Sequence, residues 1–203
     1  MDGLLILAKH KIRLPSYGPV PTKIESDAKL LPFFSRCLGA VDGSHFAVRT
    51  PLDEQPAWRN RKQQLTQNVM AACDFNGRFV YVLCGWEGSA HDGRVFHDAT
   101  FNKGFHIPEG FYYLGDAGYP NTRRLLTPFR GVRYHLQETA RTQLRPKNPE
   151  ELFNLRHSQI RTDIERVLGS LKREFRVHRT SAEFSVTTQI KIISNSWSVE
   201  LDG

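Results

Sequence analysis

The chain has 203 residues, of which 39% are hydrophobic and 24% are charged, which indicates one folded, soluble domain with a single sizeable core. No stretch approaches the roughly 20 apolar residues that a membrane helix needs, so we expect no membrane-spanning segment. The formal net charge is +7, and residues 121–180 alone contain 14 basic and 6 acidic residues, a net charge of +8. This asymmetry favours nucleic acid as a partner, although a solvated basic surface without a partner would have the same composition.

The first half of the chain predicts an irregular N-terminal segment followed by strands. Pro15–Pro21 contains three prolines and a glycine, which disfavour regular structure. A strand is predicted within Val41–Val48. Two apolar runs, Asn68–Asp74 and Arg78–Trp86, then flank Asn76-Gly77, which predicts an antiparallel hairpin with a type I′ turn. Nearly continuous apolar runs are typical of strands covered on both faces, so we place this hairpin in the middle of a sheet.

The second half predicts helices around a further strand. Ser89 and Asp92 have the spacing of a capping box, which predicts a helix that continues to about Phe101. Phe111–Leu114 predicts a strand that ends at the turn Gly115–Pro120. The region 128–147 is predicted to be irregular.

A long helix is predicted after that region. Asn148-Pro149-Glu150-Glu151 has a capping residue, a proline for the first helical position and acids for the first turn. The apolar residues that follow share one helical face: Ile160, Ile164, Val167, Leu168, Leu171 and Phe175. The order of elements predicts an α/β fold in which helices pack on a mixed sheet.

Three acidic residues are candidates for metal ligation. Asp42 lies where a strand begins, Asp116 lies at the end of a short apolar strand, and Glu165 lies just beside the apolar stripe of the long helix. Carboxylates brought together in this way repel one another unless a cation lies among them, and hard oxygen ligands suit Mg²⁺ or Mn²⁺. Each also has an ordinary structural explanation, because Asp beside Gly commonly forms a turn and an acid on a helix flank is commonly solvated.

Other chemistry receives less support from the sequence. Asp92 is equally interpreted as a helix cap, and the His91-Asp92 pair alone is a weak signal for an HD-type phosphohydrolase, because the further spaced histidines of such a site are missing. No G-x-S-x-G elbow accompanies Ser44 or Ser89, which excludes a serine hydrolase of that type. No P-loop or Rossmann glycine pattern occurs.

Four segments, in this order, carry a family resemblance: Gly39–Val48 (GAVDGSHFAV), Gly85–Phe96 (GWEGSAHDGRVF), Tyr113–Pro120 (YLGDAGYP) and Glu151–Val177. Together they resemble the DDE superfamily endonuclease domain of PIF/Harbinger transposases and their domesticated relatives. The resemblance implies a ribonuclease-H-like mixed sheet flanked by helices, truncated at both ends relative to the family. It divides the chain into an N-terminal segment (1–30), the endonuclease domain (31–193) and a divergent tail (194–203).

The same resemblance implies a site and an activity. It assigns catalysis and metal binding to Asp42, Asp116 and Glu165, with Asp92 as a possible supporting residue and with two Mg²⁺ or Mn²⁺ ions. The expected reaction is hydrolysis of phosphodiester bonds in double-stranded DNA, followed in the family by joining of 3′-hydroxyl ends to target DNA. Basic residues on and after the long helix are expected to contact phosphates: Arg156, Arg161, Arg166, Lys172, Arg173 and Arg176.

The resemblance also implies a nuclear protein, a homo-oligomer, and a separate DNA-binding protein as partner. The family's N-terminal helix-turn-helix region has no counterpart in the residues before the first motif, and its C-terminal continuation gives way to the tail. The alternative is therefore a catalytically inactive, transposase-derived DNA-binding or adaptor protein.

Overall fold

The structure is a computed structural model that describes residue 14 and residues 20–132, 146–174 and 183–196. The side chains of residues 163, 164, 168, 171–174 and 196 lie outside this description. In chain order the elements are α2 (Thr22–Glu25), α3 (Leu31–Phe34), β1 (Cys37–Ala47), α4 (Gln55–Trp58), β2 (Thr66–Cys73), β3 (Phe79–Glu87), α5 (Asp92–Phe101), β4 (Tyr112–Leu114), β5 (Leu125–Leu126), α7 (Pro149–Glu174) and α8 (Val186–Ser196).

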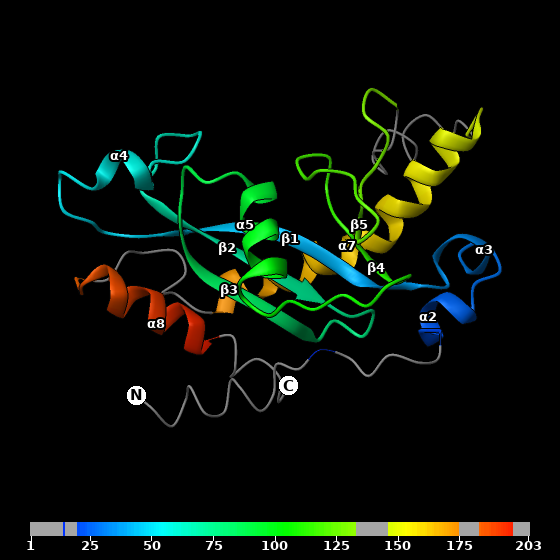
Figure 1. The fold of residues 1–203 in the computed structure, drawn as a ribbon, viewed down its shortest axis with the longest axis horizontal. Coiled ribbons are helices and arrows are strands. Elements are labelled where there is room, and N and C mark those ends of the chain that lie inside the picture. The colour runs from blue at the N-terminus through cyan, green and yellow to red at the C-terminus, as the bar shows by residue number, and fades with distance from the viewer. Residues whose placement is uncertain (1–13, 15–19, 133–145, 175–182, 197–203) are drawn as a thin grey trace.

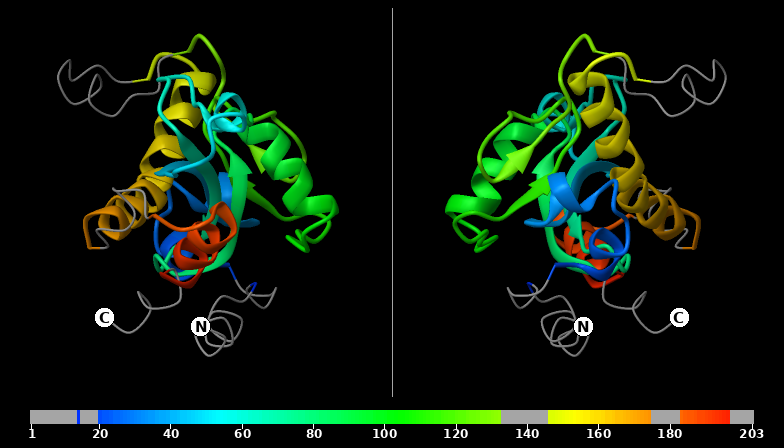
Figure 2. Two further views of the ribbon diagram at one scale, coloured as in Figure 1. Left: turned by 90° about the vertical axis from the view of Figure 1, so that its left-hand side faces the viewer. Right: turned by 90° about the vertical axis from the view of Figure 1, so that its right-hand side faces the viewer.

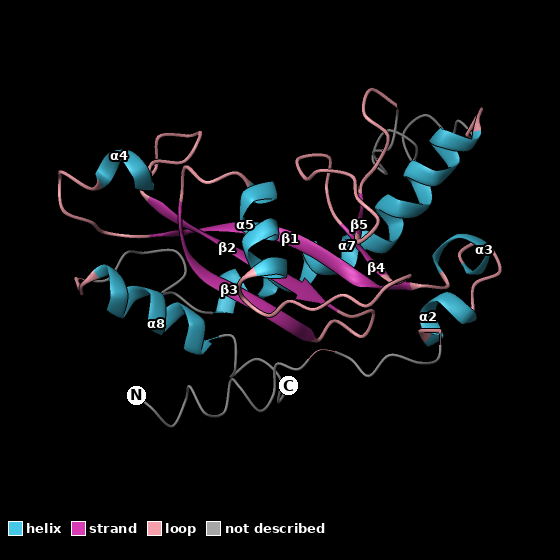
Figure 3. Ribbon diagram, viewed as in Figure 1, coloured by secondary structure: helices cyan, strands magenta, loops and turns pink. Residues whose placement is uncertain are grey.

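The strands form one mixed sheet with the order β3-β2-β1-β4-β5 (Figures 1 and 3). β2 is antiparallel to both of its neighbours, whereas β1, β4 and β5 run parallel to one another. This order and these directions are consistent with a ribonuclease-H-like sheet, so the predicted fold class is confirmed. β1 is the middle strand of the sheet.

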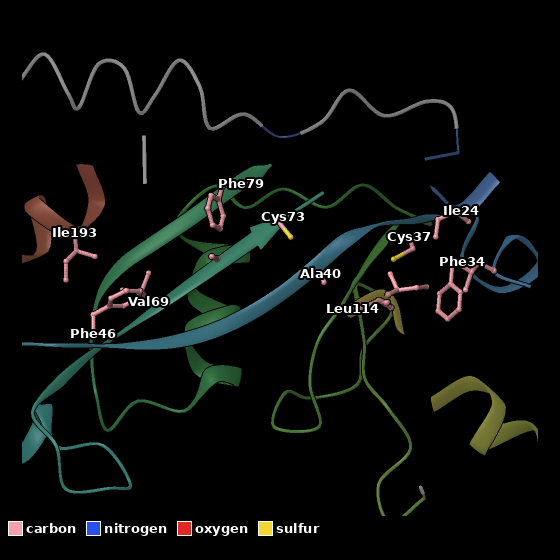
Figure 4. Close-up of a cluster of buried hydrophobic side chains, with 13 residues drawn as sticks. Ile24, Phe34, Cys37, Ala40, Phe46, Val69, Cys73, Phe79, Leu114 and Ile193 are labelled. Carbon is pink, nitrogen blue, oxygen red and sulfur yellow. The ribbon is translucent and has the colours of Figure 1, made fainter. Parts of the chain in front are cut away.

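The sheet separates two apolar cores, with α7 on one side and α5 on the other (Figure 2). Alternate residues of a strand point to opposite faces, and Ala40 and Val41 of β1 accordingly belong to different cores. The first core joins the sheet to Ile24, Phe34, Ile160 and Ile193 of the helices, and Figure 4 shows most of its members. The second core lies under α5.

The hairpin prediction is confirmed for its strands and wrong for its turn and part of its burial. Met70 pairs with Leu83 and Cys73 with Phe79. Only Gly77 of the turn has a positive φ, of 78°, because the Asp74 carboxylate accepts hydrogen bonds from the backbone N–H groups of Asn76 and Arg78 and so replaces the type I′ geometry. β2 is buried along its whole length, but β3 is the edge strand and is mostly half-buried.

The start of α5 also differs from the prediction. The helix begins at Asp92, its N-cap is His91, and no side chain caps it. Ser89 is not a helix cap, because it lies two residues before the N-cap position, and its backbone N–H donates to the carbonyl of Ala57 in α4. The strand predicted at Phe111–Leu114 is present as β4, whereas the two-residue strand β5 was not predicted.

The long helix begins as predicted. The Asn148 side chain accepts a hydrogen bond from the backbone N–H of Glu151 at 2.8 Å, and the Glu151 carboxylate accepts one from the backbone N–H of Lys147 at 2.9 Å. Ile160 is buried and Val167 is half-buried against the sheet, as the apolar stripe predicts. Phe175 lies outside the described residues.

No helix in the described part of the chain has the length and apolar character needed to cross a membrane.

Candidate active site

Asp42 lies in the middle strand of the sheet, opposite Ala71 of β2. The strand β1 pairs with β2 at this position, and its pairing with β4 on the other edge ends two residues earlier, at Ala40. The Asp42 side chain is 19% exposed, so it reaches solvent from the surface of the sheet. Asp42 is therefore a strand residue, and its interpretation as a turn former is wrong.

Asp116 follows the neighbouring strand β4. The parallel register pairs Ala40 with Leu114, so Asp42 and Asp116 each lie two residues beyond this pair along their own segments. One Asp116 oxygen, Oδ1, accepts a hydrogen bond from the backbone N–H of Gly118 at 2.8 Å. Asp116 thus forms the turn that ends β4 and also orients its carboxylate beside Asp42.

Glu165 approaches from α7, together with Arg161 one turn earlier on the helix. Arg161 Nη2 lies 2.8 Å from Glu165 Oε1 and 3.4 Å from Asp42 Oδ1. The Arg161 side chain is 12% exposed, whereas the Glu165 side chain is 53% exposed. One largely buried guanidinium therefore joins the acid of the helix to the acid of the sheet.

The electrostatic balance around Asp42 favours its protonated form. Burial raises the pKa of Asp42 to about 6, the adjacent Arg161 opposes this shift, and Asp116, Glu165 and Asp92 each raise it further. The structure thus brings together the three predicted acids and the predicted supporting residue. We name these four acids and Arg161 the acid cluster.

Asp92 reaches the acid cluster from the α5 side of the sheet. A β-carbon on Gly43 would collide with the Asp92 carboxylate, so only glycine fits next to Asp42 at this point. The Asp92 oxygen Oδ1 accepts a hydrogen bond of 2.8 Å from Asn68 Nδ2, and Asn68 also donates to the carbonyl of Ala90 at 3.2 Å. Asp92 is therefore held by a buried amide of β2 and does not cap α5.

Tyr119 is a residue of the site that the sequence did not single out. Its side chain is 1% exposed, and its hydroxyl finds no hydrogen-bond partner among the described residues. Burial raises the pKa of Tyr119 well above its ordinary value, and Asp92, Asp42 and Asp116 raise it further. A neutral hydroxyl donor therefore lies within electrostatic reach of three aspartates.

His157 is a second residue that the sequence analysis missed. It lies one turn before Arg161 on α7, and its Nε2 is 3.1 Å from the carbonyl oxygen of Leu126 in β5. Burial is the main reason that the pKa of His157 is lowered to about 4, so the imidazole is neutral and fastens α7 to the sheet. The spacing of His157, Arg161 and Glu165, four residues apart each time, is the signal that could have identified this polar row.

The donor set of the acid cluster suits a divalent cation. It consists of carboxylate oxygens, which Mg²⁺ and Mn²⁺ prefer, and four acids share the one cation that the described residues supply. In the described parts of the chain, no three carboxylate, thiol or imidazole groups are already arranged around a common point. The ligand types therefore fit a metal site, while in this arrangement Arg161 provides the compensating charge between Asp42 and Glu165.

The predicted phosphate contacts are placed differently from one another. Arg161 lies within the acid cluster. Arg156 bonds to Gln159 on the same helix at 2.9 Å, and Arg166 is exposed. The side chains of Lys172 and Arg173, and all of Arg176, lie outside the described residues.

Comparison with known proteins gives consistent matches. The sequence profile of the family described as "DDE superfamily endonuclease" matches residues 41–197. A rat protein named "Putative nuclease HARBI1" is 30% identical over 177 residues, which cover 86% of this chain and 47% of the rat protein. The human protein of the same name is 29% identical over 177 residues, with the same two shares.

A plant protein, "Protein ALP1-like" from Arabidopsis thaliana, is 27% identical over 172 residues, which cover 76% of this chain and 39% of the plant protein. The chain therefore spans less than half the length of these curated relatives. No solved structure gives a significant match to it.

Proposed function

Because this chain belongs to the family of DDE superfamily endonucleases, we propose that it is a metal-dependent nuclease that hydrolyses phosphodiester bonds in double-stranded DNA. The observation that carries the proposal is the convergence on Asp42 of Asp116, Glu165 and Asp92, which come from three other segments of the fold. A structural ion pair would require one acid for Arg161. The surplus of carboxylates is instead what binding of divalent cations requires.

In this proposal Asp42, Asp116 and Glu165 hold two Mg²⁺ or Mn²⁺ ions, and Asp92 supports them. When bound, such ions supply activation of a water nucleophile and stabilisation of the leaving oxygen. The chain's own residues set the conditions for this. Burial raises the pKa of Asp42 only to about 6, so its carboxylate is ionised at neutral pH, and Asn68 keeps Asp92 in place.

Arg161 has a definite part in the proposed site. Its single positive charge compensates one of the two negative charges of Asp42 and Glu165. Its guanidinium lies beside these carboxylates. A phosphodiester that binds at the carboxylates would therefore lie close to Arg161. This is a different role from the general contact to the DNA backbone that the helix surface predicts for it.

The substrate class follows from charge. The chain has a net charge of +7, with an excess of basic residues in the half that contains α7, and a basic surface around carboxylates suits a nucleic acid backbone. The proposal extends to a nuclear location and, as in transposases, to the joining of 3′-hydroxyl ends to target DNA. Partners that supply further DNA binding, including a second copy of the chain, belong to the same proposal.

One observation favours a second candidate function, that of a catalytically inactive DNA-binding or adaptor protein. Arg161 already compensates Asp42 and Glu165, and a permanent ion pair of this kind would keep metal ions out. The two candidates differ in one property, because only the nuclease binds Mn²⁺ at the acid cluster.

The test compares Glu165→Gln with the matched variant Glu109→Gln, which removes an exposed acid outside the acid cluster. We expect Glu165→Gln to lose Mn²⁺-dependent nicking of DNA and to keep its DNA affinity measured with Ca²⁺, because the lost charge holds an ion and not a phosphate. Glu109→Gln should retain both. Equal nicking by Glu165→Gln and the wild type would remove Glu165 from the site.

A further inference from the structure

A polar cavity of about 440 Å³ opens beside the acid cluster. One wall is the loop between β1 and β2, with Arg61 and Lys62, and the other is the segment that leads into α5. Two histidines, His45 and His91, also line it, and the carboxylate in its lining is that of Asp92. Its size is in the range of ligand sites, roughly 300–1,000 Å³, but its lining is cationic and polar. We name it the basic cavity.

The loop that carries the two cations has a fixed shape. Asn60 is 7% exposed, and its side-chain oxygen accepts hydrogen bonds from the backbone N–H groups of Lys62 at 2.9 Å and Gln64 at 3.0 Å. Gln63 takes a positive φ of 62° to complete the turn. Arg61 and Lys62 are therefore presented as exposed side chains on an ordered backbone.

The opposite wall is equally ordered. A β-carbon on Gly88 would collide with Thr66 and with the carbonyl of Trp58, so this segment lies in close contact with the start of β2 and the end of α4. The carbonyl of Ala90 is held by the buried Asn68 side chain. Across the mouth, Arg61 Nη2 lies 3.1 Å from Nδ1 of His91.

The basic cavity and the acid cluster share Asp92. This residue lines the cavity, and its carboxylate is close enough to Asp42 to raise the pKa of that residue. A second, adjoining hollow of about 360 Å³ shares the wall around His91 and ends at Arg94, whose guanidinium lies 5.4 Å from the centre of the Trp86 ring. Arg94 thus places a further cationic side chain near His91, in a hollow that Glu87 also lines.

We propose that the basic cavity binds the DNA backbone next to the phosphodiester that is cleaved, with Arg61 and Lys62 as its phosphate contacts. The assignment rests on the proposed nuclease function, because it is the acid cluster next to the cavity that makes a phosphodiester the expected ligand. When the phosphodiester to be cleaved lies at the acid cluster, the neighbouring nucleotide of the same DNA strand can reach the basic cavity. Arg61 exchanges its contact with His91 for a phosphate oxygen, which is the stronger, charge-assisted hydrogen bond.

The test measures binding of a fluorescently labelled DNA duplex to the full chain by anisotropy, with Ca²⁺ to prevent cleavage, over a range of salt concentrations. The double variant Arg61→Ala/Lys62→Ala is compared with Arg78→Ala/Lys103→Ala, which removes the same charges at the hairpin turn and at the far end of α5. Each lost phosphate contact lowers the salt slope by about 0.9. We expect the first variant to lose nearly two units of slope and the control to match the wild type.

The position of the contact is tested by NMR with thymidine 3′,5′-bisphosphate as the probe. Addition should shift the amide resonances of residues 60–64 and 88–92 in the wild type and the control, and leave them unchanged in Arg61→Ala/Lys62→Ala. Equal salt slopes in the two double variants, or shifts confined to other residues, would overturn the proposal.

Cleavage assays keep this proposal separate from that of the nuclease. If the wild type nicks plasmid and both double variants bind DNA equally, the cavity assignment fails and the nuclease function stands. If the slopes differ as expected but no variant cuts DNA, the cavity binds DNA and the nuclease function fails. Absence of DNA binding by the folded wild type overturns both.

Discussion

The acid cluster and the basic cavity meet at Asp92 but are built from different kinds of structure. Asp42, Asp116 and Glu165 come from the middle strand, the end of its parallel neighbour and the long helix, all of which pack into the two cores. Arg61 and Lys62 come from a loop and are exposed. In the proposed function, the packed framework would hold the residues that cleave the bond, while a surface loop would bind the DNA backbone.

The acid cluster and its supporting helix predict that the stability of the protein depends on pH, which is the largest effect expected on stability. The pKa of His157 is about 4 in the folded protein against an ordinary 6.5, so the unfolded chain takes up this proton first as the pH falls. The contribution is complete above pH 6.5, is lost progressively between pH 6.5 and 4, and amounts to about 3 kcal/mol.

This loss is measured as the difference between the wild type and His157→Gln in the free energy of unfolding from pH 7 to pH 4, because Asp42, whose pKa is raised to about 6 in the folded protein, changes the stability in the opposite direction over the same range. His157→Gln should lack that part of the pH dependence, whereas His97→Gln, which replaces an exposed histidine on α5, should keep it. The same pH dependence in His157→Gln and the wild type would show that His157 does not fasten α7 to the sheet.

The negative charge of the acid cluster predicts a smaller effect, on the affinity for Mn²⁺, when Arg161 is replaced. Replacing Arg161 with Ala removes the cation between Asp42 and Glu165 and makes the acid cluster more negative. We expect Mn²⁺ to bind about tenfold more tightly, because no guanidinium competes for the carboxylates. Calorimetric titration with Mn²⁺ measures this, and Arg156→Ala on the same helix is the control. Weaker binding by Arg161→Ala would show that the arginine positions the ligands instead of competing with the ion.

Much of the framework was predictable from local sequence patterns. The hairpin strands, β4 and the long helix each contain enough residues for a pattern to be recognised, and the start of α7 at Asn148 has its predicted cap. The sequence patterns gave wrong or incomplete predictions where a side-chain hydrogen bond or a long-range strand pairing determines the local structure. Asp74 changed the hairpin turn, and β5, with two residues, exists only because it pairs with β4.

The acids of the candidate site were named from the sequence, but their surroundings were not. Asp42 and Asp116 could be placed at strand positions, while the inward direction of Arg161 depends on how α7 lies across β1. Tyr119 had no pattern of its own, because its importance comes from burial beside acids far away in the chain. The basic cavity arises from contact between two loops, which no periodicity encodes.

The most direct test of a metal-dependent nuclease centred on Asp42 is nicking of supercoiled plasmid with Mn²⁺ by the wild type and by Asp42→Asn. The account predicts that the folded wild type nicks the plasmid and that Asp42→Asn is slower by about three orders of magnitude, a loss of about 4 kcal/mol of transition-state stabilisation. Nicking at the same rate by both proteins, or by neither when both are folded, would contradict it.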